Sequence, residues 1–574
     1  MIDDGDSTSR KSSRISDLMI PLVRLRSNTD EWIECATMRR EAPRLDEGEL
    51  ERRLGLAELT LLGIGACIGA GIFVLTGVEA KLAGPSVALA FLVAAASSIF
   101  SGFCYAELSS RLPISGSAYL YVYVVFGQLP ALIVVSNQLL DYHLGFATIS
   151  RSLISYVANA LEGFGIPVHP CVAGCRPFES MPWLSLSLGA PFVIMMITTI
   201  VMSGSKTNAT VNAVMTLMKL GIIVMVIAIG SQMVDTAKWE PFFLHGAGAT
   251  MQAAATLNYA YIGYDVIANA AEEASNPQRD IPRAIIGAVL VCACFYLLMC
   301  LVLCGMQTID EIDSAAPVSG AFVQRGMMGV AAAIDVGSVL GMFTGGIAGV
   351  YGQSRTYFAL ARDRMAPEAL KSTPLSALWC GGLAAILAMF LDVAQLASFL
   401  NIGVLLAYSG VAASVLLINA CSSKSEGQIL ELVVVLTALV AKGDCIWWAL
   451  PGLSLVTLVS LICFESVVRS YACGPPSTFR CPCIPFTPLV ALSVNVYLAA
   501  KLSWHAWVRL LVVSLVVTFG HRLAVYMDWL DVHEHKVEVC QTIRGTAEKS
   551  GTNPGLCRKT EPPGVPSPCC EKDC

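Results

Sequence analysis

The segment GIGACIGAGIFVLTG, residues 63–77, decides how the rest of the sequence is interpreted. It lies in an apolar run from Leu61 to Leu82, yet glycine occupies positions 63, 65, 69, 71 and 77. Each glycine inside a helix costs roughly 1 kcal/mol relative to alanine. Two explanations are open. The glycines could let neighbouring helices pack closely, or they could interrupt a membrane-spanning helix so that main-chain groups face a cavity.

The composition predicts an all-α integral membrane protein. Of 574 residues, 55% are hydrophobic and only 14% are charged, which is too little charge to cover a soluble protein of this length. The polar first 53 residues contain no apolar segment typical of a cleavable signal peptide, so we expect the first span to direct insertion. Apolar runs of roughly 20 residues recur, and we predict about fourteen spans: 57–80, 85–108, 128–157, 183–202, 209–232, 250–270, 284–306, 333–359, 375–391, 395–419, 429–443, 446–466, 486–502 and 506–526.

Positive charge predicts the orientation. The leading segment is rich in arginine, whereas the loop after the first span offers only Lys81. Later basic loops fall on the side of the N-terminus, which predicts that this side is cytosolic. An even number of spans returns the C-terminus there. We therefore expect a cytosolic tail, a ten-helix core, four additional helices and a second cytosolic tail: 1–53, 54–420, 421–526 and 527–574.

A second interruption is predicted five spans after the first. The run ATLNYAYIGYDVIANAAEEA, residues 255–274, contains Asn258, Gly263, Asp265 and Asn269 among apolar residues. Discontinuous helices in both halves of a transporter bind substrate near the middle of the membrane. The free N–H groups that begin a half-helix attract a carboxylate. The free carbonyl groups at the end of a half-helix can accept hydrogen bonds from an ammonium group. Together these groups fit an α-amino acid.

Two charged residues lie deep within predicted spans, where ionisable groups are expensive and usually functional. Asp141 is ~20 Å along its span and Lys219 ~15 Å along its own, at 1.5 Å per residue. Asp141 could steady the interrupted part of the first span or sense a cationic substrate. A structural, hydrogen-bonded aspartate is the alternative. Lys219 could likewise be purely structural.

Charges also gather where the sixth span ends. Glu273 and Arg279, with Glu272 and Arg283, could form the ion pairs of a gate together with charged residues of other spans. Those residues are Glu107, Arg111, Arg355, Arg362 and Arg364. Exposed pairs contribute only about 0–1 kcal/mol, so a solvated loop is the simpler alternative.

Several long motifs carry a family resemblance. The glycine-rich segment and AGPSVALAFLVAAASSIFSGFCYAELSSRLPISGSAYLYVYVVFGQ, residues 83–128, are followed in order by YAYIGYDVIANAAEEASNPQRDIPRAI and GVYGQSRTYFALARDRMAPEAL. Together they resemble the cationic amino acid transporter family of the amino acid–polyamine–organocation superfamily. PFTPLVALSVNVYLAAKLSWHAWVRLLV, near the end, resembles its eukaryotic branch. The resemblance covers residues 55–526 and implies a LeuT-like core of two inverted five-helix repeats.

The resemblance also implies site residues. The substrate carboxylate is expected at the N–H groups of Gly69, Ala70 and Gly71, and the α-ammonium at the carbonyls near Cys67, Ile68, Tyr259 and Ile262. Tyr259 is expected to cap the pocket. The Lys219 ammonium is expected where related transporters bind sodium, which implies sodium-independent transport. Burial favours the neutral amine, so Lys219 could also carry a proton.

We therefore expect a secondary transporter that moves amino acids by alternating access, with arginine, lysine or ornithine first and possible proton coupling. The alternatives are a neutral amino acid permease and a non-transporting amino acid sensor. No cofactor, catalytic centre or metal site is expected, and no enzyme activity. The partners are a small amino acid and the lipid bilayer, with no nucleic acid. The plasma membrane is expected first, and a vacuolar or other internal membrane is the alternative. Cys171 and Cys175 are the best disulfide candidates.

Overall fold

The computed structural model describes residues 52–69, 71–163, 167–175, 185–312, 317–419 and 479–523. The described residues form helices joined by short loops and turns, with two isolated β-bridges and no strand. Seven of the described helices are long and apolar enough to cross a membrane. The predicted all-α membrane protein is confirmed. The chain divides into two units at Ser514, and all interactions described below lie within the first.

The first group of helices begins with the interrupted one. The elements are α3 (Leu56–Cys67), η1 (Gly71–Leu75), α4 (Thr76–Ala83), α5 (Val87–Arg111), α6 (Ser117–Phe126), α7 (Gln128–Gly163), α8 (Pro170–Ala173), α9 (Gly189–Met202) and α10 (Ser205–Gly230). The η1 turn is π-helical, and α3 and α4 together correspond to the first predicted span. Cys171 and Cys175 form a disulfide, as predicted.

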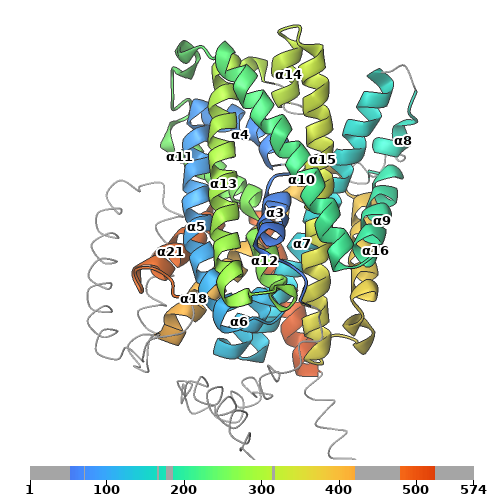
Figure 1. The fold of residues 1–574 in the computed structure, drawn as a ribbon, viewed down its shortest axis with the longest axis vertical. Coiled ribbons are helices and arrows are strands. Elements are labelled where there is room, and N and C mark those ends of the chain that lie inside the picture. Colours follow the sequence, from blue (N-terminus) through green and yellow to red (C-terminus); the bar gives the residue numbers. More distant parts are fainter. Residues whose placement is uncertain are drawn as a thin grey trace, which may run out of the picture. The chain divides into compact units, whose positions relative to one another are not determined.

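The second group repeats the pattern. Its elements are α11 (Gly246–Leu257), η5 (Asn258–Tyr261), α12 (Tyr264–Asn269), α13 (Pro277–Met306), α14 (Pro317–Val323), α15 (Met328–Arg362), α16 (Thr373–Phe390), α17 (Val393–Ser398) and α18 (Ile402–Asn419). In each group an interrupted helix comes first, and a short helix, α6 or α14, stands between the next two long ones. Figure 1 shows α6 and α14 at opposite ends of the bundle.

One predicted span is wrong in its detail. The run 395–419, expected to be continuous, is divided into α17 and α18. Asn401 takes a positive φ of 80° between them, a conformation that asparagine tolerates better than most residues. This break creates a helix N-terminus at Ile402. The last described helices are α21 (Phe486–Lys501) and Trp504–Leu523. The predicted spans 429–443 and 446–466 lie outside the described residues, as do nearly all of the two tails.

The outer surface of the helices is apolar. Large hydrophobic side chains such as Phe192, Leu217, Val224 and Ile386 are more than half exposed. A soluble protein rarely exposes so many, and hydrocarbon chains of lipid suit them. Many polar side chains are instead buried between helices. The charged and polar residues inside the bundle therefore point to the functional site.

Candidate substrate-binding site

Both predicted helix interruptions are present, and they touch each other. Helix α3 ends at Cys67, Ile68 follows in an extended conformation, and helical structure resumes at Gly71. In the second interruption Ile262 is extended and Gly263 has a φ of 149°. A Cβ atom at Gly71 would lie 2.5 Å from the Ala260 Cβ. The structure therefore shows both roles that the sequence left open for these glycines. They lie at an interruption of the helix, and they allow the two interruptions to pack closely.

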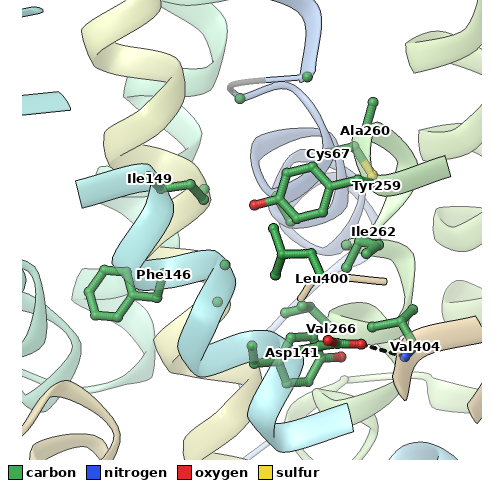
Figure 2. Close-up of a pocket in the computed structure, with 18 of the residues that line it drawn as sticks. Cys67, Asp141, Phe146, Ile149, Tyr259, Ala260, Ile262, Val266, Leu400 and Val404 are labelled. Atoms are coloured by element: carbon green, nitrogen blue, oxygen red, sulfur yellow. Dashed lines mark hydrogen bonds between the residues drawn. The ribbon is translucent and has the colours of Figure 1, made fainter. Parts of the chain in front are cut away.

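The two interruptions line one pocket. Five of the residues predicted to bind the substrate contribute to its wall: Cys67, Gly69, Gly71, Tyr259 and Ile262. Ile68 is buried beside it, and Ala70 lies outside the described residues. The remaining wall comes from α7, α12, α15 and the α17–α18 break, mostly through apolar side chains and glycines. Figure 2 shows Tyr259 over Leu400, with Asp141 and Val404 at the lower end of the same space.

A tyrosine that the sequence did not single out joins the two interruptions. The hydroxyl oxygen of Tyr296, on α13, lies 2.7 Å from the carbonyl oxygens of both Cys67 and Ala260. A single hydroxyl proton can be donated to only one acceptor at a time. Tyr296 can therefore exchange partners if the two interrupted helices move relative to each other.

Lys219 lies at the interruption of the first span. The side chain, on α10, is completely buried. Its ammonium donates to the carbonyls of Gly65 at 3.0 Å and Ile68 at 2.6 Å, and to the Thr344 hydroxyl at 2.7 Å. An ammonium group has three N–H donors, and all three are used. Lys219 thus ties the end of α3 to α15, and the Thr344 hydroxyl reinforces the tie by lying 3.2 Å from the Gly65 carbonyl oxygen.

Asp141 has different neighbours from those suggested by the sequence. Its carboxylate lines the pocket, but one oxygen accepts a hydrogen bond from the Val404 N–H at 2.8 Å and the other pairs with Arg509. These contacts join Asp141 to α18 and to the last described helix rather than to the interruption at Ile68. The sequence missed Arg509 because an arginine near the start of an apolar run usually reaches the membrane interface.

A second carboxylate lies close to the pocket. Asp265, on α12, is completely buried and accepts hydrogen bonds from Gln138, at 3.2 Å, and from the Tyr142 hydroxyl. Tyr142 itself lines the pocket. The rings of Tyr264 and Tyr408 stack nearby with centroids 5.0 Å apart. Asp265 is thus already satisfied by α7 side chains.

The glutamates that end the sixth span form ion pairs with Arg355 and Arg362, two of the partners suggested by the sequence. Glu273 accepts from Arg355 at 2.8 Å and from the Tyr351 hydroxyl at 2.8 Å, and Glu272 pairs with Arg362 at 2.6 Å. Arg279 is exposed at the start of α13 and makes no ion pair with another described residue. Both glutamates lie in the turn Ala271–Glu273 that follows α12, and they fasten the end of the sixth span to α15, which is consistent with a closed gate at this end.

The gate predicts a measurable effect on stability. Changing Glu273 to Gln should lower the free energy of unfolding by about 3–5 kcal/mol, because the buried Arg355 loses its charged partner. Thermal unfolding of the purified protein in detergent measures this. The matched control is Glu368→Gln, since Glu368 pairs with Lys371 while its side chain is 82% exposed, and there we expect no measurable change. Equal melting temperatures for the two variants would contradict a buried, closed pair.

No metal centre is evident in the part of the chain that the structure describes. No group of three or more histidine, cysteine, aspartate or glutamate side chains there could hold a metal ion. The polar groups of the pocket are main-chain groups, tyrosine hydroxyls, the Cys67 thiol, the Asn401 amide and one carboxylate, which suit a small polar molecule.

An all-α membrane bundle with two interrupted helices around a common pocket is the architecture of a membrane transport protein. Comparison with known proteins identifies the family. The family model described as amino acid permease matches residues 54–479, and the one for the C-terminus of amino acid permeases matches residues 479–527. The chain belongs to the amino acid permease family, within the amino acid–polyamine–organocation superfamily. It is a transporter and not an enzyme.

Individual relatives are named for different substrates. The chain is 38% identical to cationic amino acid transporter 9, chloroplastic, of Arabidopsis thaliana, over 83% of this chain and 88% of that protein. It is 35% identical to the methylthioribose transporter of Bacillus subtilis (strain 168), over 73% and 93% respectively. It is 32% identical to the branched-chain amino acid permease BcaP of the same organism, over 82% and 93%. These names include both charged and uncharged substrates.

Proposed function

We propose that the chain is a secondary transporter that moves an α-amino acid across a membrane by alternating access. The observation that carries the proposal is the meeting of two interrupted helices at one pocket. Main-chain groups there can bind the two charged ends that all amino acids share, while the rest of the wall receives the side chain. Alternating access would then move one half of the bundle against the other and break the ion pairs of Glu272 and Glu273.

The carboxylate of the substrate is assigned to the N–H groups of Gly69, Ala70 and Gly71, at the start of the second half-helix. The ammonium is assigned to carbonyls near Cys67, Ile68, Tyr259 and Ile262. The Cys67 and Ile68 carbonyls already accept from Tyr296 and Lys219. Each carbonyl oxygen has two lone pairs, so one acceptor position remains on each. Tyr259 caps the pocket, and a Cβ atom at Gly145 would lie 3.3 Å from its hydroxyl oxygen.

The proposed architecture is a LeuT-like pair of inverted five-helix repeats within residues 54–420, four further helices in 421–526, and cytosolic tails 1–53 and 527–574. The interrupted first helix of each group supports this, as do α6 and α14 at equivalent places in the two groups but at opposite ends of the bundle (Figure 1). The basic loops favour cytosolic termini. The plasma membrane is the first candidate location, with a vacuolar or other internal membrane as the alternative.

Transport is proposed to be sodium-independent. The Lys219 ammonium donates to oxygens of Gly65 and Ile68 in the first span and of Thr344 in α15, the eighth span. It therefore occupies the place between these two spans where a sodium ion would need oxygen ligands. A proton carried by Lys219 could couple uptake to a pH gradient.

Cationic substrates were the first expectation from the family resemblance, and the names of several relatives, which are cationic amino acid transporters, support it. The contacts of Asp141 favour the alternative, a neutral amino acid. Among the described residues that line the pocket, Asp141 is the only acidic one, and its carboxylate is already paired with Arg509. The proposed substrate is therefore an uncharged amino acid.

The test is uptake into proteoliposomes that contain the purified protein. We expect time-dependent accumulation of a radiolabelled amino acid, competed by unlabelled amino acids, with a panel of all common ones measured with and without a pH gradient. Empty liposomes are the control. Binding without flux would favour an amino acid sensor on the same fold, and absence of both would refute the proposal.

A further inference from the structure

The last described helix carries a buried charge. Arg509 lies near the start of Trp504–Leu523 and is only 8% exposed, although a mainly apolar run follows it. Removing a guanidinium from water is costly unless a partner compensates. Its Nη1 pairs with the Asp141 carboxylate, whereas Nε and Nη2 have no hydrogen-bond partner among the described residues. Asp141 is thus the main partner that stabilises this buried charge.

Asp141 is held firmly between two helices. Its Oδ2 accepts the Val404 N–H near the start of α18, and a Cβ atom at Gly403 would lie 2.8 Å from the same oxygen. The positive end of a helix also favours this carboxylate. Its Oδ1 takes the guanidinium of Arg509. Both oxygens are therefore engaged, although the side chain borders the pocket (Figure 2).

A cationic substrate would find no free carboxylate here. Asp141 is neutralised by Arg509 and by the start of α18. Asp265, the other nearby carboxylate, accepts from Tyr142 and Gln138. The wall is mainly apolar, through Phe146, Ile149, Val266 and Leu400, and the amide of Asn401 adds an uncharged polar side chain to those of the tyrosines. An arginine or lysine side chain would have to displace a tethered guanidinium from Asp141 or remain unpaired in this wall.

We propose that Arg509 is an internal counter-ion that keeps the Asp141 carboxylate paired. The carboxylate is then not available to a cationic substrate, which restricts the pocket to amino acids with uncharged, apolar side chains. The inference rests on the proposed transport function and deepens it, because it names the substrate class and the residue that sets it. Arg509 acts through Asp141 and does not itself line the pocket, so it is a positioning residue. Removing its charge releases one carboxylate oxygen to a cationic side chain.

The wild-type protein gives the first test, in proteoliposomes. Uptake of radiolabelled leucine should be inhibited by unlabelled isoleucine or valine at concentrations about tenfold or more below those at which arginine or lysine inhibit it. Equal inhibition by arginine would overturn the inference. A protein that transports no amino acid at all would refute the proposed function instead, so the two failures are distinguishable.

The second test changes the counter-ion. Arg509→Met keeps an unbranched side chain and removes the charge, and it should raise the ratio of arginine to leucine uptake about tenfold or more. Arg509→Lys, which retains the charge, should leave that ratio close to wild type. In Asp141→Asn/Arg509→Met neither charge is present, and the gain in arginine uptake should disappear. An unchanged ratio in a monodisperse Arg509→Met protein, or a gain that persists without Asp141, overturns the inference. If Arg509→Met does not fold, the wild-type competition decides alone.

Discussion

Replacing Lys219 by alanine is expected to reduce amino acid uptake by about 100-fold, equivalent to about 2.7 kcal/mol. The ammonium makes three hydrogen bonds that hold the interruption of the first span against α15. Hydrogen bonds to a charged group contribute about 1.5–3 kcal/mol each. Without them the Ile68 carbonyl loses its donor, and the backbone that is proposed to bind substrate is no longer held in place.

The measurement is initial uptake into proteoliposomes at several pH values, with and without a pH gradient. If Lys219 carries the coupled proton, any stimulation of the wild type by the gradient should be absent from Lys219→Ala. Lys371→Ala is the matched control, because Lys371 lies on the surface and pairs only with the exposed Glu368. Residual uptake that keeps the pH profile of the wild type would remove the coupling role and leave Lys219 as a structural tie.

The interruptions could be predicted because their signals are local. Glycines in the first span and polar residues in the sixth weaken a helix wherever they occur, and the spacing of five spans relates them. The depth of Lys219 within its span follows from the rise per residue, whereas its approach to the first span was implied only by the family resemblance. Reasoning from the sequence included Arg355 among the possible partners of Glu273 but could not single it out, because Arg355 is 82 residues away on α15.

The contacts that a single sequence could not predict join distant elements. Arg509 and Asp141 are 368 residues apart, and nothing near either residue indicates the other. The break between α17 and α18 has a weak local signal, an asparagine before an isoleucine and a glycine, inside an otherwise apolar run. Tyr296 is one tyrosine in a long apolar helix, and only the folded structure reveals that it bridges both interruptions. In each case the side chain has a partner that depends on tertiary packing.

Replacing Gly263 by valine is expected to abolish transport and to destabilise the protein by about 2–6 kcal/mol. A positive φ in a β-branched residue costs about 1–3 kcal/mol, and overpacking adds about 1–3 kcal/mol. Gly263 has a φ of 149°, and a Cβ atom there would lie 2.5 Å from the Ala66 Cβ and 2.9 Å from the Cys67 nitrogen. The side chain would therefore push the second interruption away from the first at the place where both meet the pocket.

Thermal unfolding and leucine uptake of Gly263→Val test this together. Gly382→Val is the matched control, since Gly382 lies within α16 with no atom within 4 Å of an added Cβ and without a positive φ. There we expect wild-type uptake and a melting temperature close to that of the wild type, because valine is at least as good a helix former as glycine. Gly263→Ala separates the two effects on uptake, since it keeps most of the strain but adds less bulk. If Gly263→Val retained full uptake and stability, the two interruptions could not be in the close contact on which the proposed substrate site depends.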